Sequence, residues 1–344
     1  MVIKNILVTG SDGYIGAVLV NRLLKQGYNV TGIDNFYFKN IELIPINSDF
    51  KQIKRDIRKL DNFSLKNFDA VIHLAALSND PMGALKPKLT KQINYCSTVK
   101  LAKLAKKQKV KKFIFSSSCS IYGSAEKGTV DESSPVNPLT AYATSKILSE
   151  GVLKKLADKN FCVGIMRNST VYGFSPKFRN DLVVNNLTTC AIALNQLKVF
   201  SDGSPWRPLI DVRDLADIFI EFIRANPALI NGEIINIGFS ENNLRVKEVV
   251  ECIHKQLPQC DVEFNKNASK DNRSYRVNFS KFKKLFPHIT QKWPIQKSIK
   301  DLISKLKQAK YSKEDFVTGK YTRLQSIQNL LSENRIDKSL FWKE

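Results

Sequence analysis

The sequence predicts an α/β protein with a doubly wound parallel sheet and a smaller mixed α/β lobe. In the first half of the chain, short apolar runs alternate with amphipathic stretches of helical length, which is typical of βαβ units in a parallel sheet. After about residue 170 the alternation becomes irregular, and Pro and Gly become more frequent. We therefore expect residues 1–170, with strands and helices added from about 207–240, to form the sheet domain. Residues 171–344 form mainly the lobe and the C-terminal helices.

The individual elements follow from the length and spacing of the apolar residues. The expected strands are 3–9, 29–34, 51–55, 69–74, 111–116 and 161–167, and in the second half 197–200, 207–211 and 233–237. The expected helices are 14–27, 89–108, 139–159, 182–196, 212–226, 244–257, 295–308 and 321–334. Strands that alternate with helices in this way lie in a sheet covered on both faces.

Composition limits the class of protein. The 344 residues are 43% hydrophobic and 25% charged, which is ordinary for a soluble globular protein. Apolar runs stay shorter than the roughly 18–20 residues of a membrane span, and the first residues enter a strand pattern directly, so we expect a cytoplasmic protein without a signal peptide. The six cysteines are scattered, and the spacing of Cys252, His254 and Cys260 does not suit a metal site, so we expect neither disulfides nor a metal.

The net charge of +22 has two interpretations. A polyanionic partner such as nucleic acid is one, and a lysine-rich surface is the other. The lysines are spread along the chain without a recognisable nucleic-acid module, so we favour the second and expect no nucleic-acid partner. A positive field still attracts phosphorylated small molecules.

A glycine-rich turn lies between the first strand and the first helix. Gly10, Gly13 and Gly16 would let the backbone approach a pyrophosphate at the helix N-terminus, as in a Rossmann-like domain. Asp34 ends the next strand, where a carboxylate accepts hydrogen bonds from a ribose and repels a 2′-phosphate, which favours NAD over NADP. A doubly wound fold without nucleotide is the alternative. The expected contacts at this end of NAD are Gly10, Gly13, Tyr14, Ile15, Gly16, Asp34, Asn35, Asp56, Ile57, Leu74, Ala75 and Ala76.

The candidate catalytic residues follow the fifth strand. Tyr142 and Lys146 are four residues apart, so a helix places them on one face. A tyrosine with a pKa of about 10 is a poor base at neutral pH, but a nearby ammonium and the positive nicotinamide ring would favour its phenolate. Lys146 could also hold the nicotinamide ribose, so both residues are expected to contact NAD as well.

Together these motifs resemble the extended short-chain dehydrogenase/reductase superfamily, in its NAD-dependent nucleotide-sugar epimerase/dehydratase branch. The resemblance covers about residues 3–285 and rests on TGSDGYIG, Asp34, HLAA, SSSCSIYG, YATSK and SDGSPWRPLIDVRDLAD. It implies that Ser118 hydrogen-bonds the substrate oxygen that Tyr142 deprotonates. It also implies cofactor contacts for Ser116, Asn94 and Thr170, although Thr170 stands where the family has an Asn, which puts contacts there in doubt.

The resemblance also assigns the substrate side. Arg207 would hold the diphosphate of a nucleotide sugar, a task suited to a guanidinium. A second arginine of the family corresponds to Arg273, with Arg276 as the alternative. A solvated surface charge is the other interpretation of each. The expected substrate contacts are Ser118, Thr170, Arg207 and Arg273.

Departures from the family pattern narrow the reaction. Dehydratases of the family carry an Asp-Glu pair where this chain has Cys119 and Ser120, and the glutamate of the decarboxylases is missing as well. Epimerases that act by enolisation have a Cys directly before Ile-Tyr, where this chain has Ser120. Cys119 is one residue early, so we expect it to pack or contact the cofactor rather than to react.

The remaining groups suit reversible oxidation of a sugar hydroxyl. We predict an NAD-dependent nucleotide-sugar epimerase that inverts C4 through a transient 4-keto sugar. The alternatives are a net NAD(P)-dependent oxidoreductase on a nucleotide-linked sugar or 4-keto sugar, and a non-catalytic nucleotide- or RNA-binding relative. By the same resemblance, a homodimer could pair the helices at 89–108 and 139–159.

Overall fold

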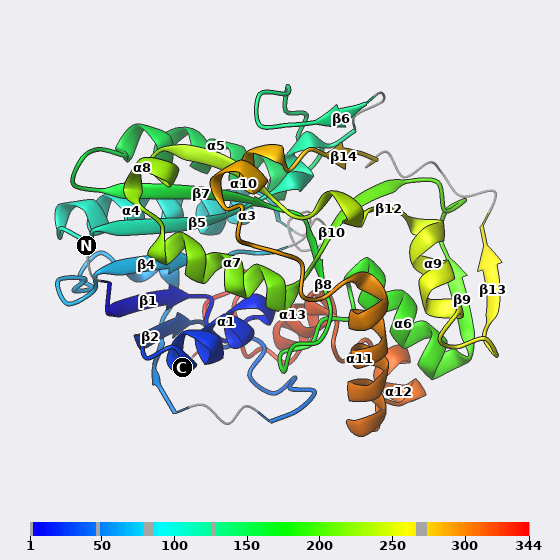
Figure 1. Cartoon of the computed structure of the whole chain (residues 1–344). Helices are drawn as coiled ribbons and strands as arrows, with labels where there is room; N and C mark the ends of the chain where they lie inside the picture. Colours follow the sequence, from blue (N-terminus) through cyan, green and yellow to red (C-terminus); the bar gives the residue numbers. More distant parts are fainter. Residues whose placement is uncertain (1–2, 46–48, 79–85, 125–127, 266–273, 344) are drawn as a thin grey trace.

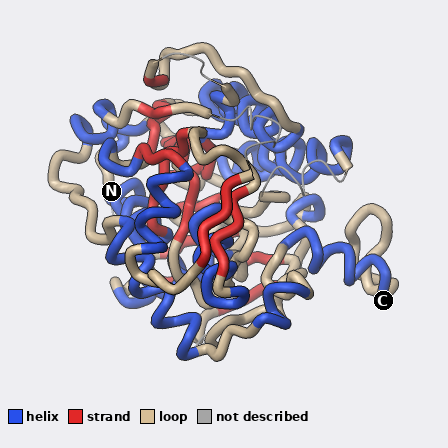
Figure 2. Tube along the Cα trace, turned by 90° about the vertical axis from the view of Figure 1, so that its right-hand side faces the viewer, coloured by secondary structure: helices blue, strands red, loops and turns tan. Residues whose placement is uncertain are grey.

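A computed structural model describes residues 3–45, 49–78, 86–124, 128–265 and 274–343. Its centre is a seven-stranded sheet in which all neighbouring strands are parallel (Figures 1 and 2). Across the sheet the strands are β11 Glu233–Ile237, β7 Cys162–Asn168, β5 Lys112–Ser118, β4 Ala70–His73, β1 Asn5–Thr9, β2 Asn29–Asp34 and β3 Lys51–Lys54. The chain runs outward in opposite directions from β1 and β4, and ligands bind at such a switch point in open α/β sheets.

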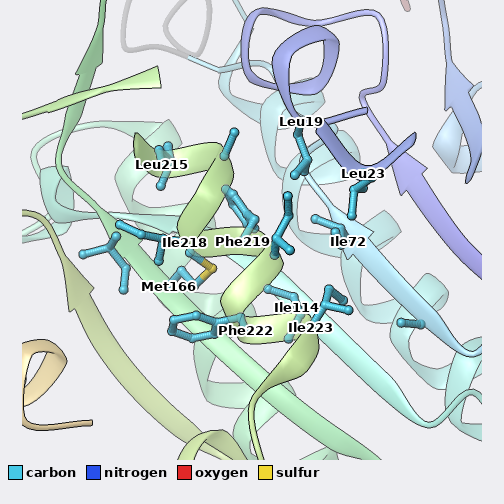
Figure 3. Packing of buried hydrophobic residues seen from close by; sticks show 14 of the residues in the cluster. Leu19, Leu23, Ile72, Ile114, Met166, Leu215, Ile218, Phe219, Phe222 and Ile223 are labelled. Atoms are coloured by element: carbon cyan, nitrogen blue, oxygen red, sulfur yellow. The ribbon is translucent and has the colours of Figure 1, made fainter. Parts of the chain in front are cut away.

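One face of the sheet is covered by α1 Tyr14–Lys25, α7 Val212–Arg224 and α10 Ser280–Leu285. Figure 3 shows this packing, with Leu19 and Leu23 of α1 and five apolar side chains of α7 lying against strand residues such as Ile72, Ile114 and Met166. The helix α7 begins after Asp211, whose carboxylate accepts the N–H of Arg213 and so caps the first turn. Its apolar residues recur at helical spacing, which explains why this face is buried.

The opposite face is covered by α4 Ser97–Lys107, α5 Ala141–Leu156 and α13 Arg323–Ser332. The predicted doubly wound α/β fold is therefore confirmed. Among the helices of the described residues, none combines the length and the hydropathy that a membrane crossing requires.

The prediction of one continuous helix at 89–108 is wrong, because the segment is divided. It consists of α3 Pro87–Thr90, a π-helical segment Lys91–Cys96, and α4. Within the π segment the Asn94 side chain is bonded to the backbone of Leu77 in both directions, at 2.8 and 3.1 Å. Such wide turns are frequent at functional sites, and a period of 3.6 residues cannot reveal one.

The second half of the chain contributes a smaller lobe (Figure 1). Its core is formed mainly by α6 Val183–Leu194, α9 Val246–His254, α11 Ile295–Gln308 and the parallel pair β9 Gln196–Val199 and β13 Asp261–Phe264. Three strands join the lobe to the sheet domain, namely β8 Thr170–Tyr172, β10 Trp206–Asp211 and β12 Asn243–Arg245. The remaining helices and strands are β6 Thr129–Val130, β14 Arg276–Val277, α8 Pro227–Ile230 and α12 Lys313–Val317, with short 3-10 turns at Ile57–Lys59, Cys119–Tyr122 and Ser240–Asn242.

Candidate active site

A cavity of about 690 Å³ lies at the carboxyl ends of the central strands and extends under the smaller lobe. Turns after β1, β2, β4, β5 and β7 form its walls, because the carboxyl ends of parallel strands meet at one edge of the sheet. Most of the residues selected from the sequence line this cavity: Gly10, Gly13, Tyr14, Ile15, Gly16, Asp34, Asn35, Asp56, Ile57, Leu74, Ala75, Ala76, Ser116, Ser118, Tyr142, Lys146, Thr170 and Arg207.

The turn after β1 and the start of α1 leave no room for a side chain at Gly10 and Gly16. Gly10 has φ +75°, and a Cβ added there would lie 2.8 Å from the backbone nitrogen of Ala75. A Cβ on Gly16 would lie 2.1 Å from the carbonyl oxygen of Gly10. The helix α1 then begins after Gly13 without a side-chain cap, which leaves its first N–H groups to an anionic ligand. This cradle fits the diphosphate of a dinucleotide.

The turn after β2 is acidic. The Asp34 carboxylate accepts the backbone N–H groups of Asp12 and Phe36, at 3.0 and 2.9 Å. Burial raises the pKa of Asp34 above its usual range, while these hydrogen bonds act in the opposite direction. Asp56 also lines the cavity, but its carboxylate is paired with Arg58 at 2.6 Å. Asp34 is therefore the carboxylate at this end that suits ribose hydroxyls and opposes a 2′-phosphate.

Tyr142 and Lys146 lie on the face of α5 that borders the cavity. Thr140 caps this helix by accepting the N–H of Ala143 at 3.1 Å. The Lys146 Nζ lies 5.5 Å from the centroid of the Tyr142 ring and donates to the carbonyl oxygen of Ser116 at 2.6 Å. Burial lowers the pKa of Lys146 from 10.5 to about 7, and the Glu150 carboxylate acts in the opposite direction. The lysine can thus gain or lose a proton near neutral pH beside the tyrosine.

A buried polar network holds α5 against the sheet. Glu150, one turn after Lys146, accepts from the Arg167 Nη2 at 2.8 Å and from the Ser117 hydroxyl at 2.5 Å. The Arg167 Nη1 in turn donates to the Tyr122 hydroxyl at 2.9 Å. Because both charges of the Glu150–Arg167 pair are buried, each depends on the other. The network orients the catalytic helix relative to β5 and β7.

Ser118 and Cys119 lie in different environments although they are neighbours. The Ser118 side chain is half-buried at the cavity wall, where its Oγ accepts the N–H of Ser120 at 3.1 Å and donates to the Ser120 hydroxyl at 2.9 Å. Cys119 is buried, its Sγ donates to the carbonyl oxygen of Arg167 at 3.1 Å, and burial raises the pKa of its thiol. A buried, protonated thiol that donates to a backbone carbonyl oxygen is suited to packing rather than to reaction as a nucleophile.

One selected residue, Asn94, does not line the cavity. Its side-chain amide is buried and forms two hydrogen bonds with the backbone of Leu77, so the structure does not direct it toward the cofactor. Arg273 lies outside the described residues. The alternative, Arg276, packs its guanidinium 5.2 Å from the centroid of the Trp206 ring.

The substrate side of the cavity is formed by the lobe. The Arg207 guanidinium donates to the carbonyl oxygen of Trp206 at 2.9 Å and lines the cavity together with Lys198. Phe200, at the end of β9, also lines it and is 80% exposed. An exposed aromatic face beside basic side chains suits a nucleotide base and its phosphates. The sequence analysis missed Lys198 and Phe200. The aromatic residue at the end of the expected strand 197–200 was the available signal.

A buried cluster of charges after β8 was also missed. Arg179 lines the cavity, forms two hydrogen bonds of 2.9 Å with the Asp181 carboxylate, and donates to the Ser78 hydroxyl at 3.1 Å. It interacts electrostatically with Tyr142. Lys177 is fully buried between Asp12 and Glu42, at 2.9 Å from each. The available signal was a pair of basic residues, Lys177 and Arg179, in the glycine- and proline-containing segment after β8, but their partners Asp12, Glu42 and Ser78 are distant in sequence.

Comparisons with known proteins agree with this geometry. The family model described as "NAD dependent epimerase/dehydratase family" matches residues 6–238. A UDP-glucose 4-epimerase of Mycolicibacterium smegmatis is 33% identical over 243 residues, which are 67% of this chain and 76% of the relative. A UDP-N-acetyl-alpha-D-glucosaminuronate decarboxylase of Bacillus cytotoxicus is 29% identical over 316 residues, 86% of this chain and 88% of the relative.

A solved structure extends the similarity to nearly the whole chain. The UDP-glucuronic acid 4-epimerase of Bacillus cereus, in complex with UDP-glucuronic acid and NAD, has a TM-score of 0.75 at 26% identity, over 88% of this chain and 99% of that chain. The predicted cofactor, NAD, is confirmed by this family and by the fit of the glycine turn and Asp34. This chain therefore belongs to the NAD-dependent epimerase/dehydratase family and is, as the sequence predicted, an enzyme of nucleotide sugars.

Proposed function

We propose that the protein interconverts the C4 epimers of a nucleotide-diphosphate sugar through a transient 4-keto sugar. The observation that carries this proposal is the arrangement of one cavity. Tyr142, Lys146 and Ser118 share it with the glycine turn of the cofactor end and with Arg207 of the substrate end. The catalytic assignment rests on this arrangement and on the family pattern.

Bound NAD supplies the acceptor and donor of hydride. Tyr142 takes the proton of the C4 hydroxyl, and Lys146 stabilises the phenolate from the next turn of α5. Ser118 hydrogen-bonds the same sugar oxygen and keeps it aligned with Tyr142. Arg207, and Arg273 in the segment outside the described residues, hold the diphosphate while the keto sugar turns. Tyr142 then returns its proton to the oxygen on the inverted carbon. Because the hydride removed from C4 would return to the opposite face of the same carbon, the reaction would have no net redox change.

The residues beside Ser118 support reversible oxidation over elimination. Loss of water from the keto sugar requires an acid and a base near the sugar. Cys119 is buried with a raised thiol pKa, and Ser120 donates its backbone N–H to Ser118. Neither side chain carries the carboxylate that dehydratases of the family have at these places.

The test uses purified protein with a panel of UDP-linked sugars that differ at C4, each deuterated at that carbon. Epimerisation predicts that NMR detects both epimers, that the deuterium stays at C4, and that absorbance at 340 nm shows no net change. Stoichiometric consumption of NAD(P) or NAD(P)H would favour the net oxidoreductase instead. Loss of deuterium from the sugar without a change at 340 nm would contradict hydride return to the same molecule.

The proposal extends to the organisation of the protein. We propose a cytoplasmic homodimer that pairs α4 with α5, supported by Leu148, an apolar side chain of α5 that is exposed. We further propose that residues 1–170, with 207–240, bind NAD and that the rest of the chain binds the sugar nucleotide. Light scattering of the purified protein, and of Leu148→Glu, tests the dimer.

A further inference from the structure

The C-terminal segment, residues 323–343, packs against the cofactor end of the cavity, although it lies beyond the residues that the family model matches. The Trp342 indole donates to the carbonyl oxygen of Asn35 at 2.6 Å, and the Tyr37 hydroxyl donates to that of Leu340. Asn35 and Tyr37 both line the cavity. The segment thus braces the turn that follows Asp34.

Arg323, the first residue of α13, reaches the cavity from this segment. Its side chain is 2% exposed, its Nη2 donates to the carbonyl oxygen of Lys177 at 2.8 Å, and its guanidinium lies 4.3 Å from the centroid of the Phe38 ring. Its Nη1 is buried and has no hydrogen-bond partner within the described part of the chain. A guanidinium has five N–H donors, and a buried donor without an acceptor is costly.

The charges around Arg323 are mixed, so the donor without a partner, Nη1, is the feature that points to a ligand. Burial and the neighbouring Arg179 lower the pKa of Arg323 to about 9, although Asp181, Asp12 and Asp34 act in the opposite direction. Asp181 pairs with Arg179, and Asp34 accepts backbone N–H groups. Asp12 pairs with Lys177 at 2.9 Å through Oδ1, while its Oδ2 is buried and has no hydrogen-bond partner within the described residues.

We propose that Arg323 is a cofactor-binding residue that holds the diphosphate of NAD, and that the C-terminal segment keeps it at the cavity wall. The residue lines the same cavity as Gly10 and Gly13, whose turn forms the other part of the diphosphate cradle. Arginine is suited to this task because its planar donors match phosphate oxygens. The inference rests on the NAD cofactor and is independent of the sugar, so it can fail while the proposed function stands.

The experiment compares Arg323→Met with the unaltered full-length protein after bound NAD has been removed. Calorimetry measures the affinities of NADH, ADP-ribose and adenosine. A lost charged hydrogen bond predicts a fall of about 10- to 100-fold for NADH and ADP-ribose, and a change within about twofold for adenosine, which has no phosphate. Arg335→Met, which removes the same charge from an exposed side chain of the segment, should leave all three affinities unchanged within about twofold.

Two results would overturn the proposal. Unchanged affinity for ADP-ribose in Arg323→Met would mean that the guanidinium does not touch the diphosphate. An equal loss for adenosine and ADP-ribose would mean that Arg323 only shapes the site. If Arg323→Met does not fold, Arg323→Gln keeps N–H donors for the buried site but removes the charge and the guanidinium fork. Its ratio of ADP-ribose to adenosine affinity then decides, because a ratio equal to that of the unaltered protein contradicts the proposal.

Discussion

The cofactor end and the substrate end of the cavity are built in different ways. Most residues at the cofactor end come from turns that directly follow β1, β2, β3 and β4, within residues 10–76. The substrate end takes Arg207, Phe200 and Tyr275 from three separate segments of the lobe. A parallel sheet gathers the first set by its topology alone, whereas the second set depends on how the lobe packs. The residues at the cofactor end are therefore easier to predict from the sequence than those at the substrate end.

The two ends also differ in how their polar groups are engaged. At the cofactor end Asp34 and Asp56 are held by hydrogen bonds from neighbouring residues. At the substrate end Phe200 is largely exposed and Arg207 borders open space in the cavity. We therefore expect changes on α5 to affect turnover, and changes in the lobe to affect substrate affinity, with NAD binding little altered in both cases.

The largest effect is expected at the catalytic helix. Tyr142→Phe removes the acid–base hydroxyl but keeps the ring, so turnover should fall by at least about a hundredfold. NADH titration should give an affinity within about twofold of the unaltered protein. Turnover close to that of the unaltered protein would contradict the proposed role of Tyr142.

A smaller effect is expected at the substrate end. Arg207→Met removes a guanidinium from the cavity, so KM for the nucleotide sugar should rise by about 10- to 100-fold, the range of a lost hydrogen bond to a charged group. Steady-state kinetics should give a kcat that changes much less, because Arg207 would hold the diphosphate equally in the ground state and the transition state. Arg224→Met, which removes a guanidinium from an exposed side chain away from the cavity, is the matched comparison. A fall confined to kcat would move Arg207 into the chemical step.

The smallest effect on turnover, measured at the pH optimum, is expected for Glu150→Gln. The carboxylate opposes the lowering of the Lys146 pKa by burial, so its loss should lower that pKa further below about 7. Since the ammonium form assists Tyr142, the alkaline fall of kcat should move to lower pH by about one unit. The pH profile separates this outcome from mere loss of stability, which lowers activity at every pH. An unmoved alkaline limb would show that Glu150 acts only through Arg167.

Sequence patterns were sufficient to predict these strands of the central sheet. The strands β1, β2, β4, β5 and β7 are apolar runs next to strong helical periods, and the structure contains them within a few residues of the expected bounds. The short strands β6, β8, β12, β13 and β14 were not predicted. They have two to four residues each, they lie outside the regular alternation of strands and helices that revealed the equally short β4, and their partners come from distant parts of the chain.

The candidate site divides in the same way. The glycine turn, Asp34, Tyr142 and Lys146 could be selected because their chemistry depends on local spacing. Arg179, Lys177 and Arg323 could not, since a charged residue in a sequence resembles a solvated surface charge until its burial is known. Asn94 had a local signal as well, but the π-helical segment turns its amide to the backbone of Leu77.

The family, the fold class and the NAD cofactor could be stated from the amino-acid sequence, because they rest on motifs whose residues are close together along the chain. The tertiary structure decided which charges are buried and which segments close the cavity. Arg323 is the clearest case, because 289 residues separate it from Asp34 and yet both line one cavity. Local propensity cannot specify a contact over such a distance in sequence, whereas burial of apolar surface on both faces of the sheet brings the C-terminal helix to the cavity.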